Sequence, residues 1–215
     1  MSIINYLLAF KPKSIYSYKN HRAGYYKYHN YINSNILLAN TIDEAFNQED
    51  ALSISLQINA MGQNMGIKIN ELMANLGKPN FHIKKDIGSH HEVIFYRNNI
   101  LRNTFLTQFH FYRGRLIYVN STFDYLGKEA GYKEFILSVF YDKYSVPKTI
   151  KFNDSLLMED KAGNRLLITD YGQLSVKYFA NDNALIERLI ATVFGSSGRN
   201  DKLISKEEEK LALAI

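Results

Sequence analysis

Residues 66–123 carry the pattern that most restricts what this chain can fold into: a short amphipathic helix followed by three strand-like runs. Gly77 can adopt the left-handed conformation that often ends a helix, and Pro79 cannot continue one. The helix is predicted from apolar residues at the i, i+3, i+4 and i+7 spacing that lines one side of a helix, namely Ile69, Leu72, Met73 and Leu76.

The runs at 91–97, 104–112 and 115–121 alternate in side-chain direction and are rich in aromatic and β-branched residues, which favours strands. Arg113 and Gly114 separate the last two runs, as the two residues of a tight hairpin do. Strands that follow a single helix in this way predict an α+β protein, with antiparallel meanders packed on helices.

One face of the predicted meander has to pack under the helix, so the other face is a candidate binding surface. Tyrosine buries apolar area while its hydroxyl stays available, and it is enriched in interface hot spots. We therefore predict a non-catalytic module that presents this face to another protein, of the inhibitor, immunity or assembly type. The alternative is that the leader or the second half covers the face, which makes the same residues core. The predicted partner-binding residues are Tyr96, His110, Tyr112 and Tyr118.

The second half of the chain repeats this order of elements, again with a helix that ends shortly before a proline, Pro147. Turn residues at 160–164 and 171–172 separate the last of its strand-like runs. The sequence predicts a helix over 128–144, strands over 149–158, 165–169 and 174–179, and a further helix over 183–194.

The lead-in to the first unit is less regular. Thr41 and Glu44 fit a capping box, so a helix is predicted over 41–64, although the alternation at 53–58 would also suit a strand. We divide the chain into a basic, tyrosine-rich leader (1–40), the lead-in with the first helix-and-sheet unit (41–125), a second unit (126–194), and a flexible joint with a charged C-terminal helix (195–215).

These motifs resemble a known family. A helix ending in Leu76-Gly77-Lys78-Pro79, an aromatic strand and an F-x-F…G-x-L-x-x-V hairpin resemble the SmpA/OmlA outer-membrane lipoprotein module. The tandem arrangement, over roughly residues 60–180, is similar to the β-lactamase inhibitor protein family, which is built from two such units. The resemblance implies a tandem α+β fold whose sheet face binds another protein. The hairpin residues that carry it are Phe109, Phe111, Gly114, Leu116 and Val119.

The net charge of +5 is concentrated at the N-terminus, because residues 1–40 contain five basic side chains and no acidic one. Seven of the 16 tyrosines also lie there. Interleaved cations and aromatic rings are typical of single-stranded nucleic-acid or anionic-surface binders. A leader that packs across the neighbouring sheet explains the same composition without a ligand. The residues of this alternative binding site, within 11–31, are Lys11, Lys13, Lys19, Arg22, Lys27, Tyr25 and Tyr28.

A further alternative is a metal-dependent enzyme. His90 and Glu92 are two positions apart on one strand, and His110 could join them across the sheet as a His₂-carboxylate set. Exposed histidines beside a loop explain the pattern equally well. The carboxylates around 154–170 are typical of turns. We therefore expect no catalytic residues, no metal and no cofactor.

Absence of cysteine excludes disulfides and thiol chemistry. The N-terminal apolar run, 3–10, is preceded by no basic residue and is too short to span a bilayer. We expect a cytoplasmic protein without a transmembrane segment.

Overall fold

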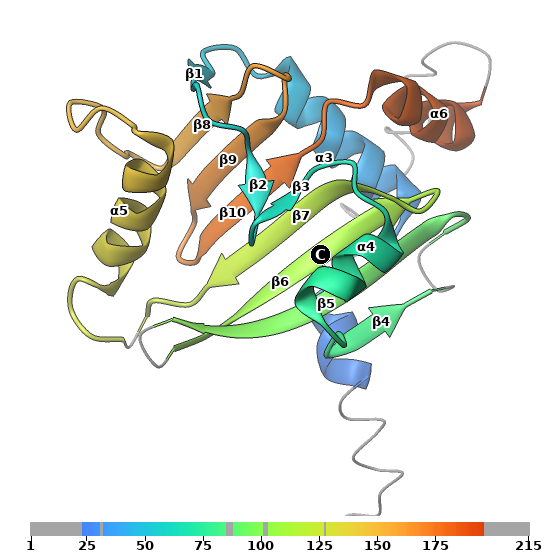
Figure 1. Ribbon diagram of the computed structural model, residues 1–215, viewed down its shortest axis with the longest axis horizontal. Coiled ribbons are helices and arrows are strands. Elements are labelled where there is room, and N and C mark those ends of the chain that lie inside the picture. The colour runs from blue at the N-terminus through green and yellow to red at the C-terminus, as the bar shows by residue number, and fades with distance from the viewer. Residues whose placement is uncertain (1–22, 31, 85–87, 101–102, 127, 196–215) are drawn as a thin grey trace, which may run out of the picture.

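The computed structural model describes residues 23–30, 32–84, 88–100, 103–126 and 128–195. An eight-stranded sheet crosses the molecule (Figure 1). In spatial order its strands are β1 (Leu52–Ser53), β8 (Ser155–Glu159), β9 (Arg165–Asp170), β10 (Leu174–Phe179), β7 (Arg115–Phe123), β6 (Asn103–Tyr112), β5 (His91–Ile100) and β4 (Phe81–Ile83). A separate two-stranded hairpin is formed by β2 (Asn59–Ala60) and β3 (Gln63–Asn64).

The sheet is antiparallel except at one edge, where β1 runs parallel to β8. The last strands of the two predicted units, β7 and β10, pair at its centre, and each unit then continues outward as a meander. The predicted α+β class with antiparallel meanders is confirmed. Both units share one continuous sheet; that they form a true repeat stays a prediction.

Helices cover both faces of the sheet, and each face is named after the helices that cover it. On the α4/α5 face, α4 (Ile69–Leu76) and α5 (Tyr132–Tyr144) pack on Phe109, Val119 and Ile168 in the larger core cluster. On the α3/α6 face, α3 (Asn35–Asn47) and α6 (Asn183–Phe194) pack on Tyr118 and Phe179. Full burial of such side chains stabilises the fold by about 1.5–3 kcal/mol each.

The helix ends and turns follow from local chemistry. The Ser34 hydroxyl accepts a hydrogen bond from the Leu37 amide, which caps α3. Gly77 ends α4, as predicted; its φ of 78° is positive, but its ψ of −163° lies outside the left-handed helical region. Arg113 and Gly114 both have positive φ, 50° and 74°, which matches a tight hairpin of the primed type. Within the described residues, no helix is long and apolar enough to cross a membrane.

Most predicted elements are confirmed, and the lead-in is not. Residues 69–76, 132–144 and 183–194 are helical as expected, and the predicted strands are present. The strand predicted over 149–158 is the largest misfit, because β8 begins only at Ser155. The predicted helix over 41–64 is right as far as Asn47 and wrong beyond it. Thr41 lies in the middle of α3, and the chain after Asn47 forms β1, β2 and β3 instead. Asp50 and Met61 have positive φ there, a conformation that a continuing helix cannot contain.

The described part of the leader is folded against the sheet. Residues 23–28 are helical, and Tyr26 stacks on Phe81 with ring centroids 5.0 Å apart. Tyr26 shares a small buried cluster with Val93 and Phe95 on the α3/α6 face. The packing explanation of the tyrosine-rich leader therefore holds for this tyrosine.

Candidate functional site

The four predicted partner-binding residues do not form an open face, so that prediction of accessibility is wrong. Tyr96 pairs with Thr107 and lies on the α4/α5 face, where its hydroxyl donates to the Gly77 carbonyl at 2.8 Å. The other three residues lie on the opposite, α3/α6 face. Exposed fractions are 5% for Tyr96, 0% for His110, 0% for Tyr112 and 1% for Tyr118.

The physical reason is that α3 and α6 cover the second face of the meander. Tyr112 and Tyr118 belong to one buried cluster with Leu38 and Ile42 of α3 and Leu189 of α6. These two tyrosines are therefore part of the core, as the alternative interpretation of the sequence predicted. Burial raises the pKa of the Tyr118 hydroxyl, as expected for a phenol removed from water.

Tyr112 offers a simple check of this core role. Its hydroxyl lies 3.0 Å from the Thr192 hydroxyl of α6, so the pair ties α6 to the sheet. We expect Tyr112→Phe to lower the free energy of unfolding by about 1 kcal/mol, because one part-buried hydrogen bond is lost without a cavity. Urea denaturation measures this. Thr192→Val should cost a similar amount, and an unchanged midpoint for both variants would contradict the tie.

The predicted metal set is not assembled. His90 is exposed in the turn before β5. The Oε2 atom of Glu92 lies 2.8 Å from the Nε2 atom of His82, so the two side chains form a hydrogen bond. His110 lies on the opposite face, because the register pairs it with Val93 rather than with Glu92. Among the described residues no group of three or more His, Asp or Glu side chains could hold a metal ion.

The register instead joins His110 to His91. The Nε2 atom of His91 lies 3.1 Å from the Nδ1 atom of His110, and both side chains are fully buried. Burial lowers the pKa of His91 to about 4. Burial, with a smaller contribution from His91, lowers the pKa of His110 well below its usual value. The outer nitrogens, Nδ1 of His91 and Nε2 of His110, have no hydrogen-bond partner in the described structure. This pair is therefore a neutral core element.

Of the leader residues predicted to bind nucleic acid, only three lie in the described part of the chain. Tyr28 is 79% exposed and Tyr25 is 39% exposed. The guanidinium of Arg97 lies 5.4 Å from the centre of the Tyr25 ring. Lys27 is exposed on the same helical segment. The remaining residues, Lys11, Lys13, Lys19 and Arg22, lie outside the described residues.

The carboxylates around 154–170 are used in structural contacts. Buried Asp160 accepts hydrogen bonds from the amides of Ile58, Ala162 and Asn164 at 2.8–2.9 Å. Glu159 pairs with Arg165. Asp170 pairs with Lys133 and accepts from the Tyr125 hydroxyl. The turn explanation of Asp160 is thus sufficient.

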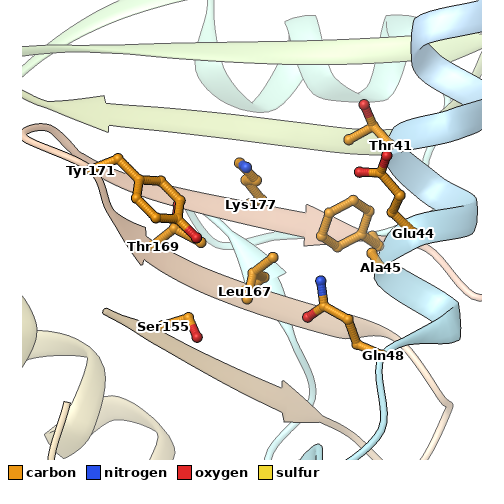
Figure 2. Close-up of a pocket in the computed structure, with 10 residues that line it drawn as sticks. Thr41, Glu44, Ala45, Gln48, Ser155, Leu167, Thr169, Tyr171 and Lys177 are labelled. Atoms are coloured by element: carbon orange, nitrogen blue, oxygen red, sulfur yellow. The ribbon is translucent and has the colours of Figure 1, made fainter. Parts of the chain in front are cut away.

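A pocket that the sequence did not suggest opens on the α3/α6 face, between α3 and the strands β8, β9 and β10 (Figure 2). Its volume is about 360 Å³, within the range of small-molecule sites. The lining residues are Thr41, Glu44, Ala45, Gln48, Ser155, Leu167, Thr169, Tyr171, Lys177 and Phe179.

Helical and strand periodicity bring these side chains together. Thr41 and Glu44 are three positions apart, so they lie along one side of α3, and Gln48 follows at the C-cap of the helix. Alternate residues of a strand share a face, which places Lys177 beside Leu167 on the pocket floor. Figure 2 shows the ring of Tyr171 beside the strands and Glu44 on the helix across from them. The site therefore has a helix wall and a sheet floor.

The polar groups of this pocket are available to a ligand. The ammonium of Lys177 is half-buried and makes no hydrogen bond or ion pair with any described residue. Burial lowers the pKa of Lys177, and the nearby Glu44 carboxylate partly opposes this. The side chains of Thr41, Thr169 and Ser155 likewise form no hydrogen bond within the described structure.

The sequence contained one signal for this site. Lys177 lies between the apolar residues Val176 and Tyr178 in a strand. Because side chains alternate along a strand, Lys177 points to the face opposite these two residues, and that face is also covered. A lysine facing inward in a strand indicates a groove or a charge partner. Thr41 and Glu44 were assigned to a helix cap, which hid their position on a helix side.

No family model matches this chain, and neither does any curated protein or solved structure. The resemblance to the SmpA/OmlA module and the β-lactamase inhibitor protein family therefore stays a prediction. The site has to be interpreted from its own chemistry.

Proposed function

We propose that this protein is a non-catalytic binding module and that its binding site is the pocket between α3 and β8, β9 and β10. The observation that carries the proposal is the convergence of the Lys177 ammonium and the Thr41, Thr169 and Ser155 hydroxyls on one open space. None of them is used inside the described fold. Lys177 and Thr41 are half-buried and Thr169 is buried, whereas Ser155 is exposed to water. Buried or half-buried polar groups normally find hydrogen-bond partners, so the unused groups of Lys177, Thr41 and Thr169 around one cavity favour a ligand that supplies them.

The size of the pocket favours a small polar molecule. A volume of about 360 Å³ accommodates a small molecule and is too small for a protein partner. The sheet floor contributes apolar area from Leu167 and Phe179 and polar groups from Lys177, Thr169 and Ser155, and the helix wall adds Thr41 and Glu44. This combination is typical of ligand sites, in which apolar contact gives affinity and a few polar groups fix orientation.

The binding character, rather than catalysis, is supported by the groups that line the pocket. Nucleophilic catalysis needs a hydroxyl within hydrogen-bond reach of a base. Neither Ser155 nor Thr169 makes such a bond with a described side chain. We also propose that the protein is cytoplasmic. The protein partner, and the nucleic-acid contact through 11–31, stay predictions that no described surface specifically favours.

The proposal is tested by closing the pocket. Ser155 is exposed at the start of β8 beside the pocket, so Ser155→Trp fills the space without entering the core. Ligand-detected NMR with a mixture of amino acids, carboxylic acids, sugars and nucleosides should show binding to the natural protein. We expect Ser155→Trp to weaken that binding by about tenfold or more, which corresponds to about 1.4 kcal/mol.

The matched control is Ser138→Trp, an exposed serine on α5, across the sheet from the pocket. It should bind as the natural protein does, and both variants should keep the melting temperature. Failure of every compound in the mixture to bind, or equal binding by the two tryptophan variants, would contradict the proposed site.

A further inference from the structure

Resting on the proposed function, we infer that the pocket takes a small zwitterion: a molecule with one carboxylate, one ammonium group and an apolar body, as in an apolar amino acid. The inference comes from two opposite charges that face the same space without meeting. Lys177 lies on the sheet floor, and Glu44 lies on the helix wall (Figure 2).

The Lys177 side chain provides the site for the carboxylate. An ammonium group has three donors and no acceptor, and here none of the donors has an acceptor among the described residues. Its half-buried position on β10 removes part of its hydration. A ligand carboxylate restores the lost interactions through charge-assisted hydrogen bonds, which are about twice as strong as neutral ones. The hydroxyl of Thr169, on the neighbouring strand β9, lies in the same pocket and can donate to the same group.

Glu44 provides the site for the ammonium. Its carboxylate acts on Lys177 electrostatically, yet the two groups form no ion pair. Two opposite charges held apart across a pocket favour a ligand that carries both charges in the complementary order. Thr41, one turn earlier on α3, adds a hydroxyl that can accept a hydrogen bond from the same ammonium.

Other ligand classes fit this arrangement less well. A phosphate would bring close to two negative charges into a pocket that holds one ammonium and one carboxylate. A divalent cation would meet a single carboxylate and a repelling ammonium. A neutral sugar would leave both charges without a counter-charge. The apolar floor of Leu167 and Phe179 matches an aliphatic or aromatic body.

The test compares three related probes with the natural protein by calorimetry and by NMR of the lysine side chains: L-leucine, leucinamide and N-acetyl-leucine. Leucinamide lacks the carboxylate, and N-acetyl-leucine lacks the ammonium. We expect L-leucine to bind and to shift the resonance of Lys177. Each masked probe should bind about tenfold or more weakly, since each loses one charge-assisted contact.

Variants assign each charge to its residue. Lys177→Met should weaken L-leucine about tenfold or more and leave N-acetyl-leucine no better than leucinamide. Glu44→Gln should weaken L-leucine while leaving N-acetyl-leucine unchanged. The matched controls are Lys161→Met and Glu187→Gln, two exposed positions outside the pocket, which should bind as the natural protein does.

The outcomes separate this inference from the proposed function. Equal binding of L-leucine and N-acetyl-leucine would replace the zwitterion with a simple anion. If none of the three probes binds, but other compounds of the mixture bind the natural protein and not Ser155→Trp, the zwitterion inference is wrong and the proposed binding site is supported. Failure of the probes and of the whole mixture would overturn both.

Discussion

Acidification from pH 7 to pH 5 should lower the free energy of unfolding of this protein by about 4 kcal/mol, because the buried pair His91 and His110 cannot accept protons in the folded state. In the unfolded chain both imidazoles titrate near their ordinary pKa of about 6.5. In the folded protein burial holds the pKa of His91 at about 4, and that of His110 well below its usual value. Their contribution is thus complete above the unfolded pKa.

The contribution is lost as the pH falls below 6.5, since the unfolded state then binds protons that the folded state does not. Two histidines together give a slope of up to about 2.7 kcal/mol per pH unit, and the His91 share ends near its folded pKa. The ring of Tyr118 packs beside His110, and among described groups only His91 affects the charge of His110. Among the described residues, no carboxylate acts on His110 to stabilise an imidazolium.

Urea denaturation at several pH values measures this effect. The double variant His91→Leu/His110→Leu replaces both members of a buried hydrogen-bonded pair with apolar groups, which can be nearly neutral at pH 7. It should lose most of the acid slope. His82, whose pKa is also lowered mainly by burial, should retain a smaller part. The control His90→Asn changes an exposed histidine at positive φ, a conformation that asparagine tolerates. A control slope as shallow as that of the double variant would contradict the assignment.

Loss of the Asp160 carboxylate should destabilise the fold by roughly 3 kcal/mol, because it leaves buried amides without acceptors. The Oδ2 atom accepts from the Ile58 amide at 2.8 Å, and the Oδ1 atom accepts from the Ala162 and Asn164 amides at 2.9 Å. One side chain thus closes the β8–β9 turn and holds the lead-in segment against it. Asp160→Asn keeps the shape and converts one acceptor oxygen into a donor.

The matched control is Asp154→Asn, since that carboxylate is exposed before β8 and makes no described side-chain hydrogen bond. We expect a loss of less than 0.5 kcal/mol or so for the control, as for surface substitutions generally. Chemical denaturation at pH 7 measures both variants. Equal, small losses would show that water replaces the carboxylate and that the turn holds without it.

Local patterns predicted most of the elements of this fold. The apolar spacing around Leu72, the stop at Gly77 and the two positive-φ residues at 113–114 are decided by neighbours in sequence. They were predicted correctly for that reason. The register was not predictable in the same way. Whether Glu92 or Val93 faces the side of His110 depends on one residue of offset between strands, which the hairpin geometry sets.

The burial of the aromatic face was also beyond local pattern. Tyr112 and Tyr118 look the same in sequence whether water or another helix covers them. Two helices lie over them here: α3, which precedes the meander in sequence, and α6, which comes near the end of the described chain. The pocket followed the same rule. Lys177 and Glu44 are brought together only by the packing of α3 on β10, so no spacing between them in the chain could reveal it.

The short strand β1 has a consequence for how the chain is made. It lies before the whole first meander in sequence, yet its partner β8 belongs to the second. The hydrogen bond from the Ile58 amide to the Asp160 carboxylate likewise joins an early segment to a late one, 102 positions apart. During synthesis from the N-terminus, the segment 52–58 and the inner edge of β7 both emerge before their partners exist. Chains released before residue 155 would therefore expose two unpaired strand edges and be prone to associate with one another, so the last third of the chain covers the strand edges that the first two-thirds leave open.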